Sequence, residues 1–218
     1  MKTQNVFAVA VAGGLLMLLT PTTSRATIIG SPHDFQNKAW NVQKVTCKVC
    51  HTPHNAKSPQ LIPLWNHQTT VAVFTPYSSA TMDSTPGQPN SVSKACLSCH
   101  DGTVAINNYG DAVSGTDYVT GSALLGTDLS DNHPISMDYD AAATADPFIR
   151  PSSTTVAGLG GATIQDAMLF LDTSDSKYKV QCASCHDVHK QKGDSGSSSL
   201  LLVLTGAGSE LCVTCHDK

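Results

Sequence analysis

Cysteines and histidines form the most conspicuous pattern in this 218-residue chain. All eight cysteines lie in four Cys-x-x-Cys pairs, and a histidine directly follows each pair. Two thiols three positions apart lie on one side of a helical turn, where both can add to the vinyl groups of one haem while the next residue ligates the iron. The pattern therefore predicts four covalently bound haem c groups. Their attachment residues would be Cys47, Cys50, Cys96, Cys99, Cys182, Cys185, Cys212 and Cys215, with His51, His100, His186 and His216 as proximal ligands.

Other uses of paired cysteines compete with haem attachment. Two pairs can form a Cys₄ zinc site, and exported proteins also use cysteines for disulfides or thioredoxin-like redox motifs. None of these chemistries requires a histidine after every second cysteine. Since four of only nine histidines occupy that position, the pattern favours haem.

Five histidines remain for the four second axial places: His33, His54, His67, His133 and His189. His54 and His189 each follow a motif histidine by three residues, about one helical turn along the same face. His54 cannot reach the far side of the haem that its own motif holds. We therefore expect His54 and His189 to serve as distal ligands of other haems.

The other three spare histidines lie in different local contexts. Pro134 biases His133 toward an extended loop conformation, from which a side chain can reach over a haem face. His33 lies near the expected mature N-terminus, in a segment that iron ligation would order. His67 lies close to Trp65, so a packing or hydrogen-bonding role and a distal role both remain open for it.

Methionine is the alternative sixth ligand, at Met82, Met137 or Met168. Methionine more often fills gaps in a core, and the spare histidines are sufficient in number. We expect two histidines at every iron, and hence low redox potentials, since an axial methionine would raise them.

The elements that must position these residues have weak sequence signals. Aromatic residues make up 6% of the chain, so side chains alone would build a thin core. We expect a multihaem cytochrome c fold that is loop-rich, with short helices around the CxxCH motifs, few short strands and a haem-filled core. The interval Asp101–Gln181 has no motif and is expected to wrap over haem edges. The expected helices are Lys38–His54, Thr163–Asp172 and Val180–Lys190, the strands Val71–Phe74 and Thr103–Ile106, and the loops Ser78–Ser93 and Gly193–Ser199.

Residues 1–26 have the pattern of a secretory signal peptide. Lys2 precedes an apolar run that is too short to span a bilayer comfortably, and Ser24-Arg25-Ala26 forms a cleavage site. One tetrahaem domain, residues 27–218, would remain, with no membrane span after cleavage. It keeps all 17 acidic residues and loses two of the 13 basic ones, so its formal net charge is −6. Nucleic acid is thus an unsuitable partner, and we expect an exported protein at the cell surface or outside the cell, otherwise in the periplasm.

Six stretches around the histidines carry a family resemblance: His33-Asp34, Cys50-His51-Thr52-Pro53-His54-Asn55, Pro63-Leu64-Trp65-Asn66, Cys99-His100-Asp101-Gly102-Thr103, Asp131-Asn132-His133-Pro134 and Cys185-His186-Asp187-Val188-His189. Together they resemble the OmcE-type tetrahaem cytochromes exported by metal-reducing bacteria, some of which polymerise into extracellular filaments. The resemblance implies closely packed haems, each held by two histidines. It also implies that a histidine of one subunit ligates a haem of the next, with His33 or His67 as candidates.

The function that these patterns favour is electron transfer without catalysis. The expected partners are redox cytochromes, extracellular metal or mineral acceptors, and further copies of the chain. Two alternatives remain open: a soluble periplasmic electron shuttle, and a multihaem reductase with one open haem site. The surplus of histidines argues against the reductase, which needs an iron with a vacant distal position.

Overall fold

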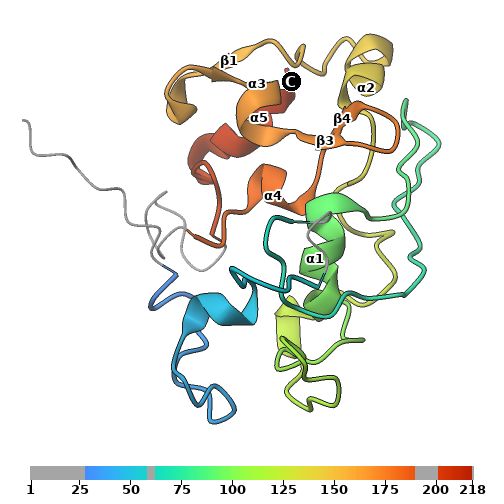
Figure 1. The fold of residues 1–218 in the computed structure, drawn as a ribbon. Coiled ribbons are helices and arrows are strands. Elements are labelled where there is room, and N and C mark those ends of the chain that lie inside the picture. The colour runs from blue at the N-terminus through green and yellow to red at the C-terminus, as the bar shows by residue number, and fades with distance from the viewer. Residues whose placement is uncertain (1–27, 58–61, 190–200, 218) are drawn as a thin grey trace, which may run out of the picture.

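The computed structural model describes residues 28–57, 62–189 and 201–217, and the expected signal peptide lies outside these ranges. The described chain is loop-rich, with short helices and a few short strands, as expected (Figure 1). In this part of the chain no helix is long and apolar enough to cross a membrane. The helices are η1 (Thr46–Val49), α1 (Ser91–His100), η2 (Gly121–Ala123), α2 (Tyr139–Ala145), η3 (Ala157–Leu159), α3 (Ile164–Met168), α4 (Cys182–Cys185), η4 (Ala207–Ser209) and α5 (Glu210–Cys215), where η marks a 3-10 helix.

The expected helices prove shorter than the sequence suggested. Between residues 38 and 54 the only helix is the 3-10 helix η1, because the chain before it forms successive tight turns and Lys44 has a positive φ of 52°. The helix expected from Val180 covers only α4, since His186 is already extended with φ −117° and ψ 134°. The helix expected from Thr163 ends after Met168, where the chain turns into a strand.

The expected strands Val71–Phe74 and Thr103–Ile106 are wrong, because neither segment pairs with a neighbouring strand. The strands lie elsewhere, in two short antiparallel hairpins: β1 (Thr155–Val156) with β2 (Ala162–Thr163), and β3 (Phe170–Asp172) with β4 (Lys177–Lys179). Gly160 and Gly161 connect the first pair with positive φ angles that glycine adopts without steric cost. Strands of two or three residues are too short for the alternation that sequence analysis detects.

Side-chain caps lie at the N-termini of α2 and α3. The Asp138 side chain accepts a hydrogen bond from the backbone nitrogen of Ala141 at the start of α2. Thr163 does the same for Asp166 at the start of α3. Such caps satisfy backbone donors that the first helical turn leaves without partners, and each contributes about 1 kcal/mol.

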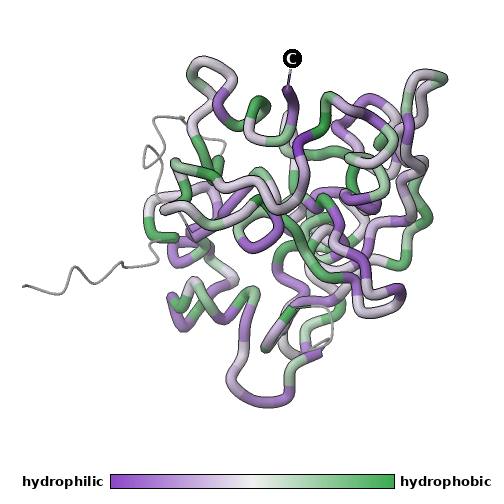
Figure 2. The backbone as a smooth tube through the Cα atoms, turned by 90° about the horizontal axis from the view of Figure 1, so that it is seen from above, coloured by the Kyte–Doolittle hydropathy of each residue, from purple (hydrophilic) through white to green (hydrophobic). Residues whose placement is uncertain are grey.

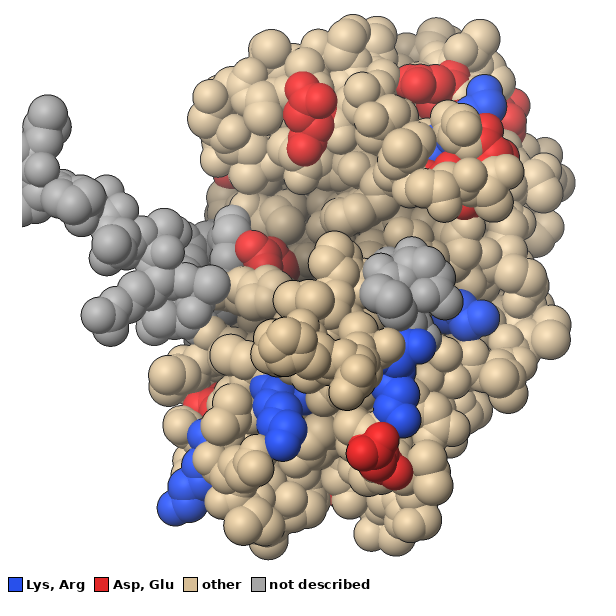
Figure 3. All heavy atoms as spheres, viewed as in Figure 1, with Lys and Arg blue, Asp and Glu red and all other residues tan. Residues whose placement is uncertain are grey.

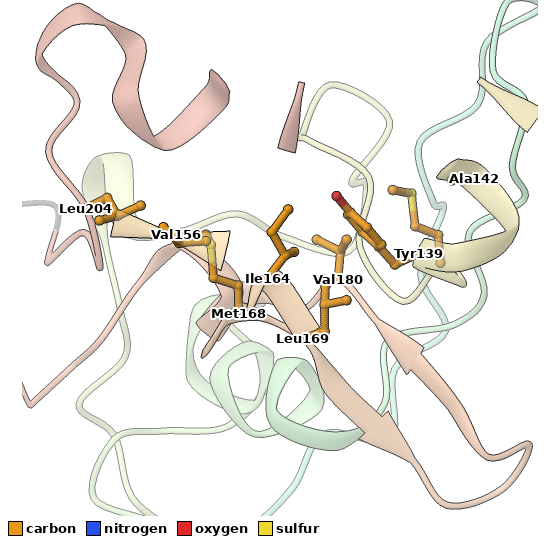
Figure 4. Packing of buried hydrophobic residues seen from close by; sticks show 9 residues of the cluster. Tyr139, Ala142, Val156, Ile164, Met168, Leu169, Val180 and Leu204 are labelled. Carbon is orange, nitrogen blue, oxygen red and sulfur yellow. The ribbon is translucent and has the colours of Figure 1, made fainter. Parts of the chain in front are cut away.

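All buried members of the larger apolar cluster except Leu204 lie in the interval Asp101–Gln181, which was expected only to wrap over haem edges. Side chains from α2, α3 and the two hairpins converge there (Figure 4). Met137 and Met168 are buried in this cluster and Met82 packs against it, which matches the packing role expected for the methionines. The buried members are Met137, Tyr139, Ala142, Val156, Ile164, Met168, Leu169, Val180 and Leu204. The region therefore has a side-chain core of its own.

A second apolar cluster, between residues 72 and 135, is smaller. It consists of Phe74, Leu97 and Leu129, with Ala72 and Ile135 against them. Figure 2 shows hydrophobic and hydrophilic residues mixed in short stretches along the described backbone. Apolar burial alone thus gives this part of the chain only a small core.

Polar contacts connect α1 to α4, which lies between α1 and the α3 and α5 region in Figure 1. The Gln181 side chain, only 1% exposed, donates to Asn90 Oδ1 at 2.9 Å. The backbone nitrogen of Cys182 donates to the buried Ser93 hydroxyl at 2.8 Å. Because an unsatisfied buried polar group costs about 1–3 kcal/mol, these contacts hold the two helices in register.

The second hairpin contains a buried ion pair. Lys179 Nζ lies 2.7 Å from a carboxylate oxygen of Asp172 and 2.7 Å from one of the more exposed Asp175. Burial alone would raise the pKa of Asp172, but hydrogen bonds from Lys179, Ser174 and Asn90 outweigh it and hold the pKa well below its usual value. A depressed carboxyl pKa stabilises the fold above the pKa of the unfolded chain, about 4, and this stabilisation is lost as the pH falls further.

Asp172→Asn should lower the free energy of unfolding by about 2 kcal/mol at neutral pH, since Lys179 keeps only Asp175. The difference from the parent protein should shrink as the pH falls below about 4. Urea titrations followed by circular dichroism at several pH values measure both effects. Asp175→Asn is the control and should cost about 0.5 kcal/mol. If the effect of Asp172→Asn is constant with pH, the role of the carboxylate charge is contradicted.

Candidate haem sites

Each of the four motifs lies on a helical turn. The second motif lies at the end of α1, which contains Cys96, Cys99 and His100. The third cysteine pair spans α4, and the fourth lies in the C-terminal part of α5. In the first motif, Cys47 lies within the 3-10 helix η1 and Cys50 directly follows this helix. In α4 and α5 the motif histidine leaves the helix in an extended conformation. The thiols of each pair thus lie on one turn with the histidine directly after them.

Three motif histidines face a spare histidine. The ring centroids are 6.0 Å apart for His33 and His100, 6.3 Å for His51 and His189, and 6.2 Å for His133 and His216. An iron bound to two imidazole nitrogens at about 2.0 Å each would separate the ring centres by about 6.2 Å. Ordinary aromatic pairs also lie within this range, so the distance alone is not diagnostic. Every pair combines one motif histidine with one spare histidine.

Backbone carbonyls orient several of these rings. His51 Nδ1 lies 3.1 Å from the carbonyl oxygen of Pro63, His100 Nδ1 lies 2.8 Å from that of Ala123, and His133 Nδ1 lies 3.0 Å from that of Pro134. A ligating histidine ordinarily donates its other ring N–H to such an acceptor, which fixes the tautomer. The Nε2 atoms of these rings are then available for iron.

His33 is held in a mostly buried position beside His100. Burial, and to a smaller degree the nearby His100, His189 and His186, lower the pKa of His33 to about 4. The imidazole is thus neutral, which is the form that ligates a metal. Its buried Nδ1 has no hydrogen-bond partner in the described structure. This nitrogen can therefore still form a hydrogen bond.

Aromatic packing orders the segment that carries His33. Phe35 contacts both His33 and Trp40, with ring centroids 6.1 and 6.0 Å apart. Trp40 Nε1 donates to Asp117 at 2.7 Å, and Lys38 pairs with the same carboxylate at 3.1 Å. This N-terminal segment is therefore ordered by side-chain contacts, which the sequence analysis did not foresee.

His67 and His54 differ from the paired histidines. His67 is 1% exposed, with Nδ1 2.8 Å from the Gln68 carbonyl oxygen and Nε2 3.1 Å from those of Ala105 and Ile106. Both of its nitrogens thus face backbone acceptors, and Nε2 also lies 3.7 Å from Cys99 Sγ, an attachment thiol of the second motif. His54 is exposed, and among the described residues its ring faces no motif histidine.

The thiols of successive motifs lie near one another. Burial raises the pKa of the Cys99 thiol to about 12, and Cys50 of the first motif contributes to the shift. Burial raises the pKa of Cys185 to about 11, with a contribution from Cys215 of the fourth motif. The first motif therefore neighbours the second, and the third neighbours the fourth.

A contact between Cys96 and Cys182 joins the second motif to the third. Their hydrogen bond lowers the pKa of Cys182 below its usual value and raises that of Cys96 well above its usual value. The four attachment points therefore adjoin in sequence order. Haems attached at these thiols would have their edges close together.

The competing chemistries gain no support from this geometry. All eight cysteines are free thiols. Among residues 28–57, 62–189 and 201–217, no group of three or more histidine, cysteine or acidic side chains is arranged to hold a bare metal ion. The donor set of two thiols and facing imidazoles fits haem instead.

Sequence reasoning missed the atoms that orient the histidines. The carbonyl oxygens of Pro63, Ala123 and Pro134 have no side-chain signature, so no pattern could have identified them. A carboxylate also lies beside His189, in the form of Asp187 at 3.4 Å from Nδ1. An acidic residue two positions before a candidate ligand is a signal that could have been noted.

In a comparison with protein families, residues 176–218 match the family described as the doubled CXXCH motif. This range contains the third and fourth motifs and covers less than a quarter of the chain. A comparison with curated proteins finds no match. The family match indicates covalent haem binding of the multihaem c-type cytochrome kind, and with it electron transfer.

Replacing Cys182 and Cys185 together by alanine should remove one covalently bound haem, because the third motif would lose both attachment atoms. Mass spectrometry after extraction of non-covalent haem measures the number that remains. Ala183→Ser, which keeps both thiols of the same helix, should retain the parent number. An unchanged mass increment in the double variant would contradict haem attachment at α4.

Proposed function

We propose that the protein carries electrons through four covalently bound haems, each ligated by two histidines. The observation that supports this proposal best is the set of three facing imidazole pairs, each made of one motif and one spare histidine. Haem supplies the one-electron chemistry when bound, and the chain supplies ligands, spacing and electrostatics. His33, His133 and His189 are the distal ligands opposite His100, His216 and His51.

His54 is assigned to the remaining distal place. Its side chain is exposed, and its ring is not engaged by backbone acceptors in the described structure, in contrast to that of His67. An exposed imidazole can bind a haem of its own subunit or of a neighbouring copy. The intermolecular role implied by the family resemblance is thus better suited to His54 than to His33 or His67.

The adjoining attachment thiols support a continuous electron path. Cys50 lies near Cys99, Cys96 contacts Cys182, and Cys185 lies near Cys215. Electron transfer through such an array requires only that neighbouring haem edges be close. The order along the path would follow the order of the motifs in the chain.

The reductase alternative requires an open iron, whereas the proposed ligand set closes every distal position. Spectra of the oxidised protein separate the two functions, since a closed array is wholly low-spin and an open iron adds a high-spin fraction. A high-spin fraction in the parent protein would favour the reductase.

We further propose that the protein acts outside the inner membrane, at the cell surface or beyond, and passes electrons to partner cytochromes and to metal or mineral acceptors. The net charge of −6 expected after signal cleavage suits cationic acceptors. On the face in Figure 3, charged side chains are sparse and most of the surface is neutral. A neutral surface suits contacts between copies, as in the filaments of OmcE-type cytochromes.

The assembly part of the proposal is tested by negative-stain images of the holoprotein over a range of concentration and ionic strength. Filaments would support polymerisation. Particles of subunit size under every condition would instead support the soluble periplasmic shuttle, which has the same haem array.

Three single variants replace His33, His133 or His189 by alanine. Each should convert one haem from six-coordinate low-spin to five-coordinate high-spin iron, because the distal ligand is lost. Electron paramagnetic resonance and the binding of carbon monoxide after reduction measure this change.

His67→Gln is the matched control, since the buried His67 ring lies beside the attachment thiol of Cys99 but, among the described residues, faces backbone carbonyls and no motif histidine. The variant should remain wholly low-spin. High-spin iron in His67→Gln, or its absence in all three alanine variants, would refute the ligand assignment.

A further inference from the structure

The charges of the chain are distributed unevenly. Residues 28–57 contain four lysines and one aspartate, a formal charge of +3, whereas residues 58–218 contain seven basic and sixteen acidic residues, a formal charge of −9. In the lower part of Figure 3, which has the view of Figure 1, lysine side chains are more prominent than acidic ones. The segment that carries the first motif lies in that part of the molecule (Figure 1). The first motif is therefore in a basic region of an acidic protein.

Lys44 and Lys48 retain their charge without an acidic partner. In the described ranges no carboxylate lies within ion-pair distance of either ammonium group, and Lys48 donates instead to Gln43 Oε1 at 2.6 Å. Asp34, the acid of the same segment, accepts hydrogen bonds from Gly30, Gln36 and Thr46. Five other basic residues do form ion pairs: Lys38, Lys57, Arg150, Lys177 and Lys179.

The surface around these two lysines is apolar and contains an attachment thiol. Successive tight turns between residues 35 and 44 leave Val42 86% exposed, and Val45 is 45% exposed. Cys47 is also exposed, directly before Lys48. We call Val42, Lys44, Val45, Cys47 and Lys48 the basic face. A haem bound through Cys47 would be attached at the surface of the protein, where another protein can approach it.

Unpaired lysines beside exposed valines have the character of a transient protein interface. Charges at the rim attract a partner of opposite sign and increase the rate of association, while a small apolar area excludes water on contact. Transient electron-transfer complexes bury little surface, so a face of this size is sufficient. A cationic metal acceptor would be repelled here and attracted by the acidic remainder of the chain. The partner that fits the basic face is an acidic protein.

We infer that the basic face is the docking site of an acidic electron-transfer protein that delivers electrons to the haem attached at Cys47. The inference rests on the proposed haem array and adds the place where electrons enter it. In each transfer the reduced cofactor of the partner loses one electron, and one ferric haem becomes ferrous.

Reduced flavodoxin, an acidic electron-transfer protein, is a suitable probe. Mixing it with the oxidised holoprotein in a stopped-flow instrument measures the second-order rate constant of haem reduction, as the flavin passes from hydroquinone to semiquinone. The rate constant should fall as ionic strength rises, because salt screens the attraction. The double variant Lys44→Gln/Lys48→Gln should lower the rate constant about tenfold at low ionic strength and weaken its salt dependence.

Lys94→Gln/Lys177→Gln is the matched control, because it changes the net charge equally at positions outside the basic face. Its rate constant should stay close to that of the parent protein. Equal losses in the two double variants would reduce the effect to net charge and overturn the inference.

Two further measurements separate the remaining outcomes. Sedimentation of the holoprotein measures self-association. If Lys44→Gln/Lys48→Gln weakens self-association and leaves the flavodoxin rate unchanged, the basic face joins copies of the chain and the inference fails. Reduction by excess dithionite tests the haem array by itself. Full reduction together with an unchanged flavodoxin rate would overturn only the docking site, whereas haems that cannot be reduced in the parent protein would overturn the electron-carrier proposal.

Discussion

Contacts between imidazole rings connect parts of the chain that are far apart in sequence. His33 faces His100, and His133 faces His216. An iron shared by each pair would convert a weak ring contact into a coordination link that closes a long loop of the chain. Metal binding of this kind contributes directly to folding, because the unfolded chain has no preformed site. The small amount of regular secondary structure is understandable on this basis.

The surroundings of the first and the fourth motif would depend on iron coordination to different degrees. Around the fourth motif, α2, α3 and two hairpins form an apolar cluster, and Tyr139 extends it by donating its hydroxyl to the Arg150 carbonyl oxygen. Around the first motif there are mainly turns and aromatic contacts, and the small Phe74 cluster includes Leu97 of the second motif. A haem at the first motif would therefore contribute more to local order than one at the fourth, where side chains pack.

Histidines of identical chemistry have different surroundings in this fold. The His67 ring has carbonyl oxygens at both nitrogens and is only 1% exposed, which suits packing. His100 has a carbonyl at Nδ1 only and a second imidazole opposite. His189 has a carboxylate in place of the carbonyl. Acceptors at Nε2 therefore separate His67 from the paired histidines, whereas the partner at Nδ1 distinguishes the paired histidines from one another.

The candidate haem attachment residues could be identified from sequence because the attachment pattern is local: two thiols and a histidine within five consecutive positions define it. The loop-rich character also followed from composition. The helix expected from Lys38 and the strand expected from Val71 failed because both require partners or periodic packing that the surrounding chain does not supply. Which spare histidine faces which motif histidine was decided only by tertiary structure, since the contacts join distant segments. The hydrogen-bond partners of His67 were also decided by tertiary structure. They are backbone carbonyl oxygens, which every residue has, so the sequence cannot identify them.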